Sequence, residues 1–427
     1  MVGYTGFGQE QSQKVLTRPE HVQAVFRDSD KHRKAVNNNS GFYLGELLGQ
    51  CVGLVSGKNW KTLKSVVDGP FQQTTVTTYV DLVEQRTRRY LTELSAKESF
   101  SNGVLDPVMD LKMLPFWVVS DVVYGTLSPA LEQQLVGVAP RREELFKHAI
   151  SGGITRFWFS RYLPLAAIRE LWWFKSAWVT FNEDIYRYAL SSGGQASICQ
   201  MFEAVNHGTI SEQQLFQTLD EMLFANLDVT MGGLSWNLVF LAANPTAQNR
   251  LRQEISEHRG ENSWKSANYL LKSSSYLNAC ILESSRLKPL APFSVPQSAP
   301  TDRIVDGFRI PAGTNFIIDS YALNTGNPFW QPDPSTYRPE RFLEKEGPQL
   351  RYNYWRFGFG PRQCMGRYLA DMIIRILLVE ILEDFQLSLP IASGEWSRVA
   401  ETWISHPEIK LNCVRIEKQK WPDANLD

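Results

Sequence analysis

One cysteine, Cys364, lies in a glycine-rich loop that reads F-G-F-G-P-R-Q-C-M-G from Phe357 to Gly366. Gly360 and Gly366 flank this cysteine, and Arg362 precedes it by two residues. A cysteine thiolate can bind iron, and residues without a β-carbon let the backbone approach a flat macrocycle closely. The loop is therefore predicted to hold a metal through Cys364, with Arg362 placed to offset an acidic group of the cofactor.

The segment after the loop, RYLADMIIRILLVEILEDF, has the apolar spacing of a helix with one buried face. The positive end of such a helix would point at the thiolate and stabilise its charge. The alternative is an ordinary buried thiol before a core helix, because free cysteine is among the most buried residue types.

The loop matches the pattern F-x-x-G-x-R-x-C-x-G at every fixed position. It resembles the haem-binding loop of the cytochrome P-450 superfamily, in which the cysteine is the proximal iron ligand. Three further motifs stand in the family's order. They are W-x-x-x-K from Trp60 to Lys64, E-x-x-R from Glu283 to Arg286, and P-E-R-F from Pro339 to Phe342.

The resemblance implies a mainly α cytochrome P-450 fold with a small β-rich part, and we expect residues 1–427 to form a single domain. It implies a haem b, iron protoporphyrin IX, whose iron is bound by Cys364. The cofactor-binding residues that it implies are Phe357, Gly360, Arg362, Cys364, Gly366, Trp60, Lys64 and Gln297.

Two of these residues depart from the family. Lys64 replaces the usual arginine that donates to a haem propionate, which keeps the charge but loses the bidentate fork. Gln297 stands where an arginine or histidine often faces a propionate, and it can donate a hydrogen bond only without charge. We therefore expect a somewhat loosely held haem. The resemblance also implies that Arg341 completes a buried Glu283–Arg286–Arg341 triad that holds the cysteine loop.

The segment from Leu215 to Ala243 is apolar on nearly all sides and predicts one long central helix. A transmembrane interpretation is disfavoured, because Asn226, Asp228 and Asn237 interrupt the segment and a charge inside a bilayer is costly.

In the family, an acid and an alcohol on this helix relay protons to bound dioxygen. Here Asp228 holds the acid's place, Asn226 replaces a glycine, and Val229 takes the usual threonine's place. Thr230 is the remaining hydroxyl, but successive helical residues point about 100° apart. Two explanations stay open. Either Asp228, Asn226 and water carry the protons, or the enzyme depends less on proton delivery.

Composition excludes some functions. The chain has 44 basic and 45 acidic residues, which gives no case for a nucleic-acid partner. Its five cysteines show no metal-finger spacing, and the odd count argues against a disulfide framework and favours a reducing compartment. The six histidines form no cluster that suggests a second metal site.

Several local patterns give further expectations. Gln13 to Thr17 predicts a strand, and a helix is expected from Pro19 to about Phe26. Residues 37–56 are expected to be a loop, and residues 302–324 and 395–416 to form short strands. The family's earlier strand, helix and membrane anchor are missing, so we expect a shortened gene model or an engineered soluble form. The parent protein is expected at the cytoplasmic face of the endoplasmic reticulum membrane.

The middle of the chain is helical and rich in aromatic residues. A core position is favoured for Trp158, Trp172, Trp173 and Trp178. The corresponding region of the family roofs the substrate cavity and its tip can dip into the membrane, so an interface-seeking surface is the alternative.

The leading hypothesis is an NADPH-dependent haem-thiolate monooxygenase that inserts one oxygen atom into a hydrophobic small molecule. NADPH–cytochrome P-450 reductase is the expected electron donor, with cytochrome b5 as a second candidate. The motifs look most like fungal members of secondary metabolism, where an amino-acid-derived or diketopiperazine scaffold is one hypothesis. The alternatives are oxidative coupling, ring formation or desaturation without oxygen insertion, for which Val229 is the only support, and a non-catalytic haem sensor or carrier.

Overall fold

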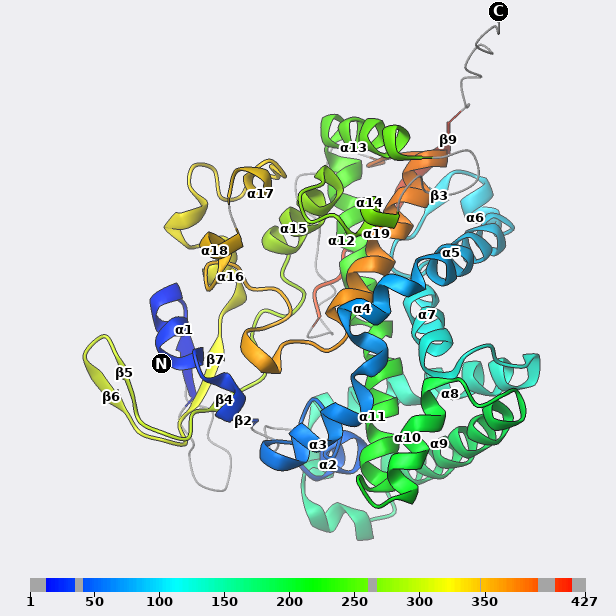
Figure 1. Ribbon diagram of the computed structural model, residues 1–427, viewed down its shortest axis with the longest axis vertical. Helices are drawn as coiled ribbons and strands as arrows, with labels where there is room; N and C mark the ends of the chain where they lie inside the picture. Colours follow the sequence, from blue (N-terminus) through cyan, green and yellow to red (C-terminus); the bar gives the residue numbers. More distant parts are fainter. Residues whose placement is uncertain (1–12, 35–40, 260–266, 346, 391–403, 417–427) are drawn as a thin grey trace, which may run out of the picture.

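The computed structural model describes residues 13–34, 41–259, 267–345, 347–390 and 404–416. Helices dominate, and short strands gather mainly at one side (Figure 1). The α-helices are α1 Pro19–Phe26, α2 Gly41–Leu48, α3 Gly57–Val67, α4 Gln73–Val76, α5 Val80–Ser95, α6 Glu98–Ser101, α7 Met113–Tyr124, α8 Pro129–Ser151, α9 Ala166–Ser191, α10 Ser197–Asn206, α11 Glu212–Phe224, α12 Val229–Ala243, α13 Pro245–His258, α14 Ala267–Leu271, α15 Tyr276–Leu287, α16 Ser320–Asn324, α17 Arg341–Glu344, α18 Gly347–Leu350 and α19 Arg367–Asp384.

The strands form three small sheets. The strands are β1 Gln13–Leu16, β2 Arg33–Lys34, β3 Val104–Leu105, β4 Gln297–Ser298, β5 Arg303–Val305, β6 Phe308–Ile310, β7 Asn315–Ile318, β8 Phe385–Ser388 and β9 Leu411–Arg415. The largest sheet has the order β1-β7-β4-β2, with β1 parallel to β7 and the other pairs antiparallel. The other sheets are β3-β9-β8 and the hairpin β5-β6. The mainly α fold with a small β-rich part is confirmed.

Helices α12 and α19 pack against each other near the centre of the molecule (Figure 1). Nearly all of α12 is buried, as its all-round apolar sequence predicts. The helix after the cysteine loop is confirmed as α19, but the single buried face predicted for it is wrong. Every residue from Met372 to Leu382 is buried, because α5, α12, α13 and α15 all pack against this helix.

The prediction of one continuous helix over residues 215–243 is wrong. Helix α11 ends at Phe224, a 3₁₀ turn covers Ala225–Leu227, and α12 begins at Val229. The physical reason lies in Asn226, whose side-chain amide donates to the Met222 carbonyl. Such local side-chain bonds compete with the helical backbone and favour tighter turns. The break occurs at the residues on which the proton-relay hypothesis rests.

Among the other expectations, the strand at β1 and the helix at α1 are confirmed. The loop expected over residues 37–56 is wrong where the structure describes it, because α2 occupies Gly41–Leu48 with Tyr43, Leu47 and Leu48 buried. Short strands are confirmed at β5, β6, β7 and β9. Residues 395–403 of the last predicted segment lie outside the described residues.

Three of the four tryptophans favoured for the core are exposed. Trp178 is buried on α9, but Trp158 is 66% exposed and Trp172 and Trp173 are also exposed. The guanidinium of Arg141 covers the Trp173 ring at 3.8 Å. The core prediction is therefore wrong for these three residues. In the part of the chain that the structure describes, no helix is both long and apolar enough to cross a bilayer.

Candidate functional site

The loop before α19 presents Cys364. The loop turns back on itself, so that the Cys364 N–H donates to the Phe357 carbonyl at 2.8 Å, and Phe357 takes a left-handed backbone with φ of 59°. Cys364 is exposed, whereas the other four cysteines are buried. Desolvation by the surrounding atoms raises the pKa of its thiol. An accessible thiol at the head of a central helix can act as a metal ligand once a metal displaces its proton.

The surroundings of Gly360 and Gly366 differ, so glycine is favoured at the two positions for different reasons. At Gly360 a β-carbon would lie 2.2 Å from Ser29 Oγ, and φ is +67°. Gly360 therefore allows the left-handed turn of the loop and its close contact with Ser29, and its role in admitting a macrocycle stays a prediction. At Gly366 a β-carbon would meet no other atom within 4 Å. The open side of Gly366 fits the close approach of a flat cofactor.

Arg362 and Trp60 lie together beside the loop. The Arg362 guanidinium stacks 4.5 Å from the centre of the buried Trp60 ring and donates to the Val55 carbonyl at 2.9 Å. Burial lowers the pKa of Arg362 to about 10, against the raising charge of Glu221. The structure therefore joins the start of α3 to the cysteine loop, as their shared role in the resemblance implies.

Lys64 and Gln297 are placed differently from each other. The Lys64 amine donates at 2.7 Å to Asp68, the residue that follows α3, so the charge of Lys64 is already paired with this carboxylate. Gln297 is only 7% exposed on β4, and its Oε1 has no hydrogen-bond partner among the described residues. An acceptor without a partner is costly to bury, and rotating the amide by 180° would turn its NH2 group to the same place, where it could donate to a ligand oxygen.

These features fit a haem. The thiol of Cys364 would supply the iron ligand, the open side of Gly366 the approach of the ring, and Trp60, Arg362 and Gln297 the polar contacts for its carboxylates. Two observations carry the fit: the accessible thiol and the unpartnered Gln297 amide.

At the start of the central helix, the residues of the predicted proton relay do not form one connected chain of hydrogen bonds within the described residues. Thr230 is buried, and its hydroxyl donates to Asn226 Oδ1 at 2.7 Å. Val229 is 37% exposed in an otherwise buried helix, one turn from the exposed Ala225. The Asp228 carboxylate has no hydrogen-bond or ion-pair partner within the described residues. The structure thus couples Thr230 to Asn226 and leaves an apolar face at Ala225 and Val229.

Sequence reasoning missed His406, which holds the helix break. Its ring is 4% exposed, and Nε2 donates to the Asp228 carbonyl at 3.0 Å. The Gly232 N–H donates to the same carbonyl at 2.9 Å. A β-carbon at Gly232 would lie 3.0 Å from the His406 ring, so glycine is needed for this approach. No local pattern could have revealed a partner this distant in sequence.

The comparisons with known proteins agree with this site. The family model for cytochrome P450 matches residues 4–410. The chain belongs to the cytochrome P450 family. It is 48% identical over 406 residues to "Cytochrome P450 monooxygenase asaD" of Aspergillus flavus, an alignment that covers 94% of this chain and 77% of the relative. It is 50% identical over 408 residues to "Cytochrome P450 monooxygenase aclC" of Aspergillus oryzae, covering 95% and 83%. It is 40% identical over 415 residues to "Cytochrome P450 monooxygenase gliC" of Aspergillus fumigatus, covering 95% and 81%.

Membership in the P450 family implies a haem-thiolate cofactor, a redox partner and a small-molecule substrate. The triad expected from the same resemblance is present as a buried cluster. Glu283 forms two hydrogen bonds with Arg286, at 2.7 and 2.8 Å, and lies 3.4 Å from Arg341 Nε. Arg341 donates mainly to the Trp330 and Pro332 carbonyls. The cluster therefore ties α15 to the chain that leads into the cysteine loop.

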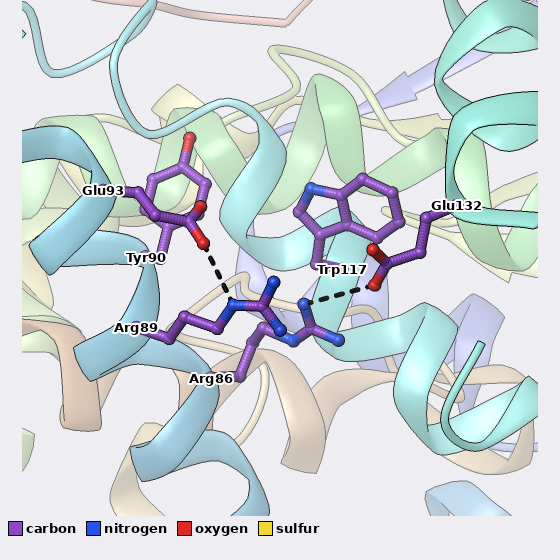
Figure 2. Close-up of a pocket in the computed structure, with 6 residues that line it drawn as sticks. All are labelled: Arg86, Arg89, Tyr90, Glu93, Trp117 and Glu132. Carbon is purple, nitrogen blue, oxygen red and sulfur yellow. Dashed lines mark hydrogen bonds and ion pairs between the residues drawn. The ribbon is translucent and has the colours of Figure 1, made fainter. Parts of the chain in front are cut away.

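A separate pocket of this P450 lies between α5, α7 and α8 (Figure 2). It has a volume of about 100 Å³, and its lining residues are Arg86, Arg89, Tyr90, Glu93, Trp117 and Glu132. Its charges are paired within the pocket, with Arg89 3.0 Å from Glu93 and Arg86 3.8 Å from Glu132 (Figure 2). None of the predicted site residues lines it, and it needs no charged ligand.

Proposed function

We propose that this P450 is a haem-thiolate monooxygenase that uses O₂ and two electrons to oxidise a hydrophobic small molecule. The observation that carries the proposal is the accessible Cys364 thiol, alone among the five cysteines, in the loop before α19. Bound haem would supply the oxidising chemistry. The relatives that match nearly all of this chain are named monooxygenases.

The chain's own residues would bind and orient the reactants. Cys364 would hold the iron, and Trp60, Arg362 and Gln297 would bind the cofactor's carboxylates. Ala225 and Val229 would present an apolar surface to the substrate and exclude water from it. Asn226 and Thr230 form one hydrogen-bonded pair, and Asp228 beside them would exchange protons with solvent.

We propose NADPH as the electron source, through NADPH–cytochrome P450 reductase, and cytochrome b5 as a second donor to be tested. Location at the endoplasmic reticulum membrane is part of the same proposal. The exposed aromatic side chains of Phe157, Trp158, Phe159 and Tyr162, clustered between α8 and α9, support contact with a membrane surface. Serine at Trp158 and Phe159 should weaken binding to liposomes, and unchanged binding would count against this surface.

For the substrate, we propose an amino-acid-derived scaffold such as a diketopiperazine in fungal secondary metabolism. Metabolites should be compared between strains with and without this gene. A lost product that is one oxygen atom heavier than the accumulating precursor supports oxygen insertion on this scaffold.

One observation favours a second candidate function, oxidative coupling or desaturation without oxygen insertion. Val229 is exposed where the family's alcohol usually stands, and Thr230 donates inward to Asn226. Proton delivery would then matter less than in a hydroxylase. A lost product two hydrogens lighter than its precursor would favour this function over oxygen insertion.

A further inference from the structure

The candidate haem site has few free cations for two carboxylates. Lys64 is paired with Asp68, and Gln297 carries no charge. Arg362 remains, but part of its hydrogen bonding goes to the Val55 and Gly53 carbonyls. Another basic side chain near Gln297 is therefore needed to match the charge of the two carboxylates.

Lys34 stands directly opposite Gln297. Strands β2 and β4 are antiparallel, and Lys34 pairs with Gln297 in their register. Directly opposite residues of an antiparallel pair point to the same face, with β-carbons about 5 Å apart. The Lys34 and Gln297 side chains therefore share one face of the sheet.

The backbone of Lys34 also joins it to the Arg362 side of the site. Its N–H donates to Ser56 Oγ at 2.9 Å, at the start of α3. The preceding residue, Val55, is the one whose carbonyl accepts from Arg362. Strands β2 and β4 lie near the start of α3 (Figure 1), and the charge of Arg362 acts on Lys34, so Lys34, Gln297 and Arg362 belong to one region.

The Lys34 amine has no ion-pair partner among the residues that the structure describes. Glu221 is near, but it lies 3.0 Å from the Gly53 N–H, which donates to it. Burial, followed by the charge of Arg362, lowers the pKa of Lys34 to about 8, while Glu221 raises it. Two like charges in a partly buried place are unfavourable, and an anionic ligand would relieve them.

We infer that Lys34 binds a haem carboxylate beside Gln297 and supplies the positive charge that Gln297 lacks. The inference rests on the haem cofactor that family membership implies. It also opposes the expectation of a loose haem. If no side chain supplies the positive charge that Gln297 lacks, Gln297→Arg should hold haem more tightly than the wild type. If Lys34 supplies it, Gln297→Arg brings two cations together and gains nothing.

The test is the rate at which the purified holoprotein gives up haem to an excess of apomyoglobin, followed by absorbance. Lys34→Met should lose haem about tenfold faster or more, because it removes a charge-assisted hydrogen bond. Lys34→Arg should stay near the wild-type rate. In the Lys34→Met background, Gln297→Arg should restore slow loss, because it returns a cation to the same face.

Arg33→Met is the matched control. Arg33 is exposed, is adjacent on the same strand, and points to the opposite face. It should leave the rate unchanged. A second control uses haem whose two carboxylates are methyl esters. The wild type and Lys34→Met should release this neutral haem at the same rate.

Equal release of ordinary haem by the wild type and Lys34→Met would overturn the inference. So would an equally accelerated release of the ester by Lys34→Met, because the defect would then be general damage to the site. A protein that binds no haem through Cys364 would instead overturn the cofactor assignment, so the two failures can be told apart.

Discussion

The cysteine loop and the helix break before α12 are built in different ways. On the cysteine side, consecutive residues from Phe357 to Gly366 form the loop, and backbone hydrogen bonds fix it. On the central-helix side, the break after Phe224 depends on Asn226 and on the distant His406. The difference teaches that the ligand side can be inferred from local sequence, whereas the geometry around Val229 depends on tertiary contacts.

The largest expected effect concerns the cysteine side. Cys364→Ala should abolish thiolate-bound haem and with it the oxidation, because no other described cysteine is accessible. The reduced, carbon monoxide-treated protein should lack the red-shifted Soret band of a thiolate-bound haem. Cys199→Ala, which changes a buried cysteine on α10, should keep that band. If the band persisted in Cys364→Ala, Cys364 would not be the iron ligand.

The buried cluster behind the cysteine loop should give the next largest effect. Glu283→Gln removes the charge between two buried arginines and should lower the free energy of unfolding by about 3–5 kcal/mol. Its control is Glu344→Gln, which affects the exposed pair with Arg338 and should cost less than about 1 kcal/mol. Urea unfolding measures both. Equal losses would mean that the cluster is no more important than a surface pair.

The central-helix side can be disturbed at Gly232. Alanine there places a β-carbon 3.0 Å from the His406 ring and 3.2 Å from Leu290. We expect a loss of about 1–3 kcal/mol in the free energy of unfolding, because a packed core resists added volume. Gly137→Ala, on α8 with open space at the β-carbon, should instead stabilise the protein by up to about 1 kcal/mol. A stabilising Gly232→Ala would show that His406 does not need the close approach.

A pH dependence should distinguish the carboxylate-binding region from the central helix. In the apoprotein the pKa of Lys34 is about 8, lowered by burial and by Arg362 and raised by Glu221. Lys34 is charged below this pKa and loses its charge above it. Haem affinity should therefore fall as pH rises through 8, by at most about tenfold per pH unit. Titration of apoprotein with haem should show this fall in the wild type, and the same fall in Lys34→Met would contradict it.

The smallest effect is expected at Thr230. Its hydroxyl is committed to Asn226, so Thr230→Val should slow product formation by less than about tenfold. A positioned acid–base group usually contributes about a hundredfold or more. The matched change is Val229→Thr, which places a hydroxyl on the exposed side and should raise the fraction of NADPH use that yields product. A hundredfold loss in Thr230→Val would assign Thr230 the relay role after all.

The sequence predicts the cysteine side of the site better than the central-helix side. The cysteine loop, α19 and the Glu283–Arg286–Arg341 cluster could be predicted, because each depends on residue types at fixed spacings. The helix break could not, because it depends on the Asn226 side-chain bond, which an apolar pattern hides, and on His406, which is distant in the sequence. Lys34 was missed because a lysine on a two-residue strand carries no signal until β2 pairs with β4.

The exposed tryptophans show another limit of prediction. Hydrophobicity favoured burial of Trp158, Trp172 and Trp173. Trp158, however, lies on the 3₁₀ turn Trp158–Tyr162 before α9, and Trp172 and Trp173 lie on α9 outside its buried face. The Arg141 guanidinium lies 3.8 Å from the centre of the Trp173 ring, and the Lys175 amine lies 4.6 Å from the centre of the Trp172 ring. The two loop glycines also differ in their surroundings, since Ser29 fills the space beside Gly360 and the space beside Gly366 is open.

The most direct test of the account is oxidation under ¹⁸O₂ by the purified haem-loaded enzyme with a reductase and NADPH. The substrate is the precursor that accumulates without the gene. The account predicts a product that contains one ¹⁸O atom by mass spectrometry and that fails to form with Cys364→Ala. A product that forms with loss of two hydrogens and no ¹⁸O would contradict oxygen insertion.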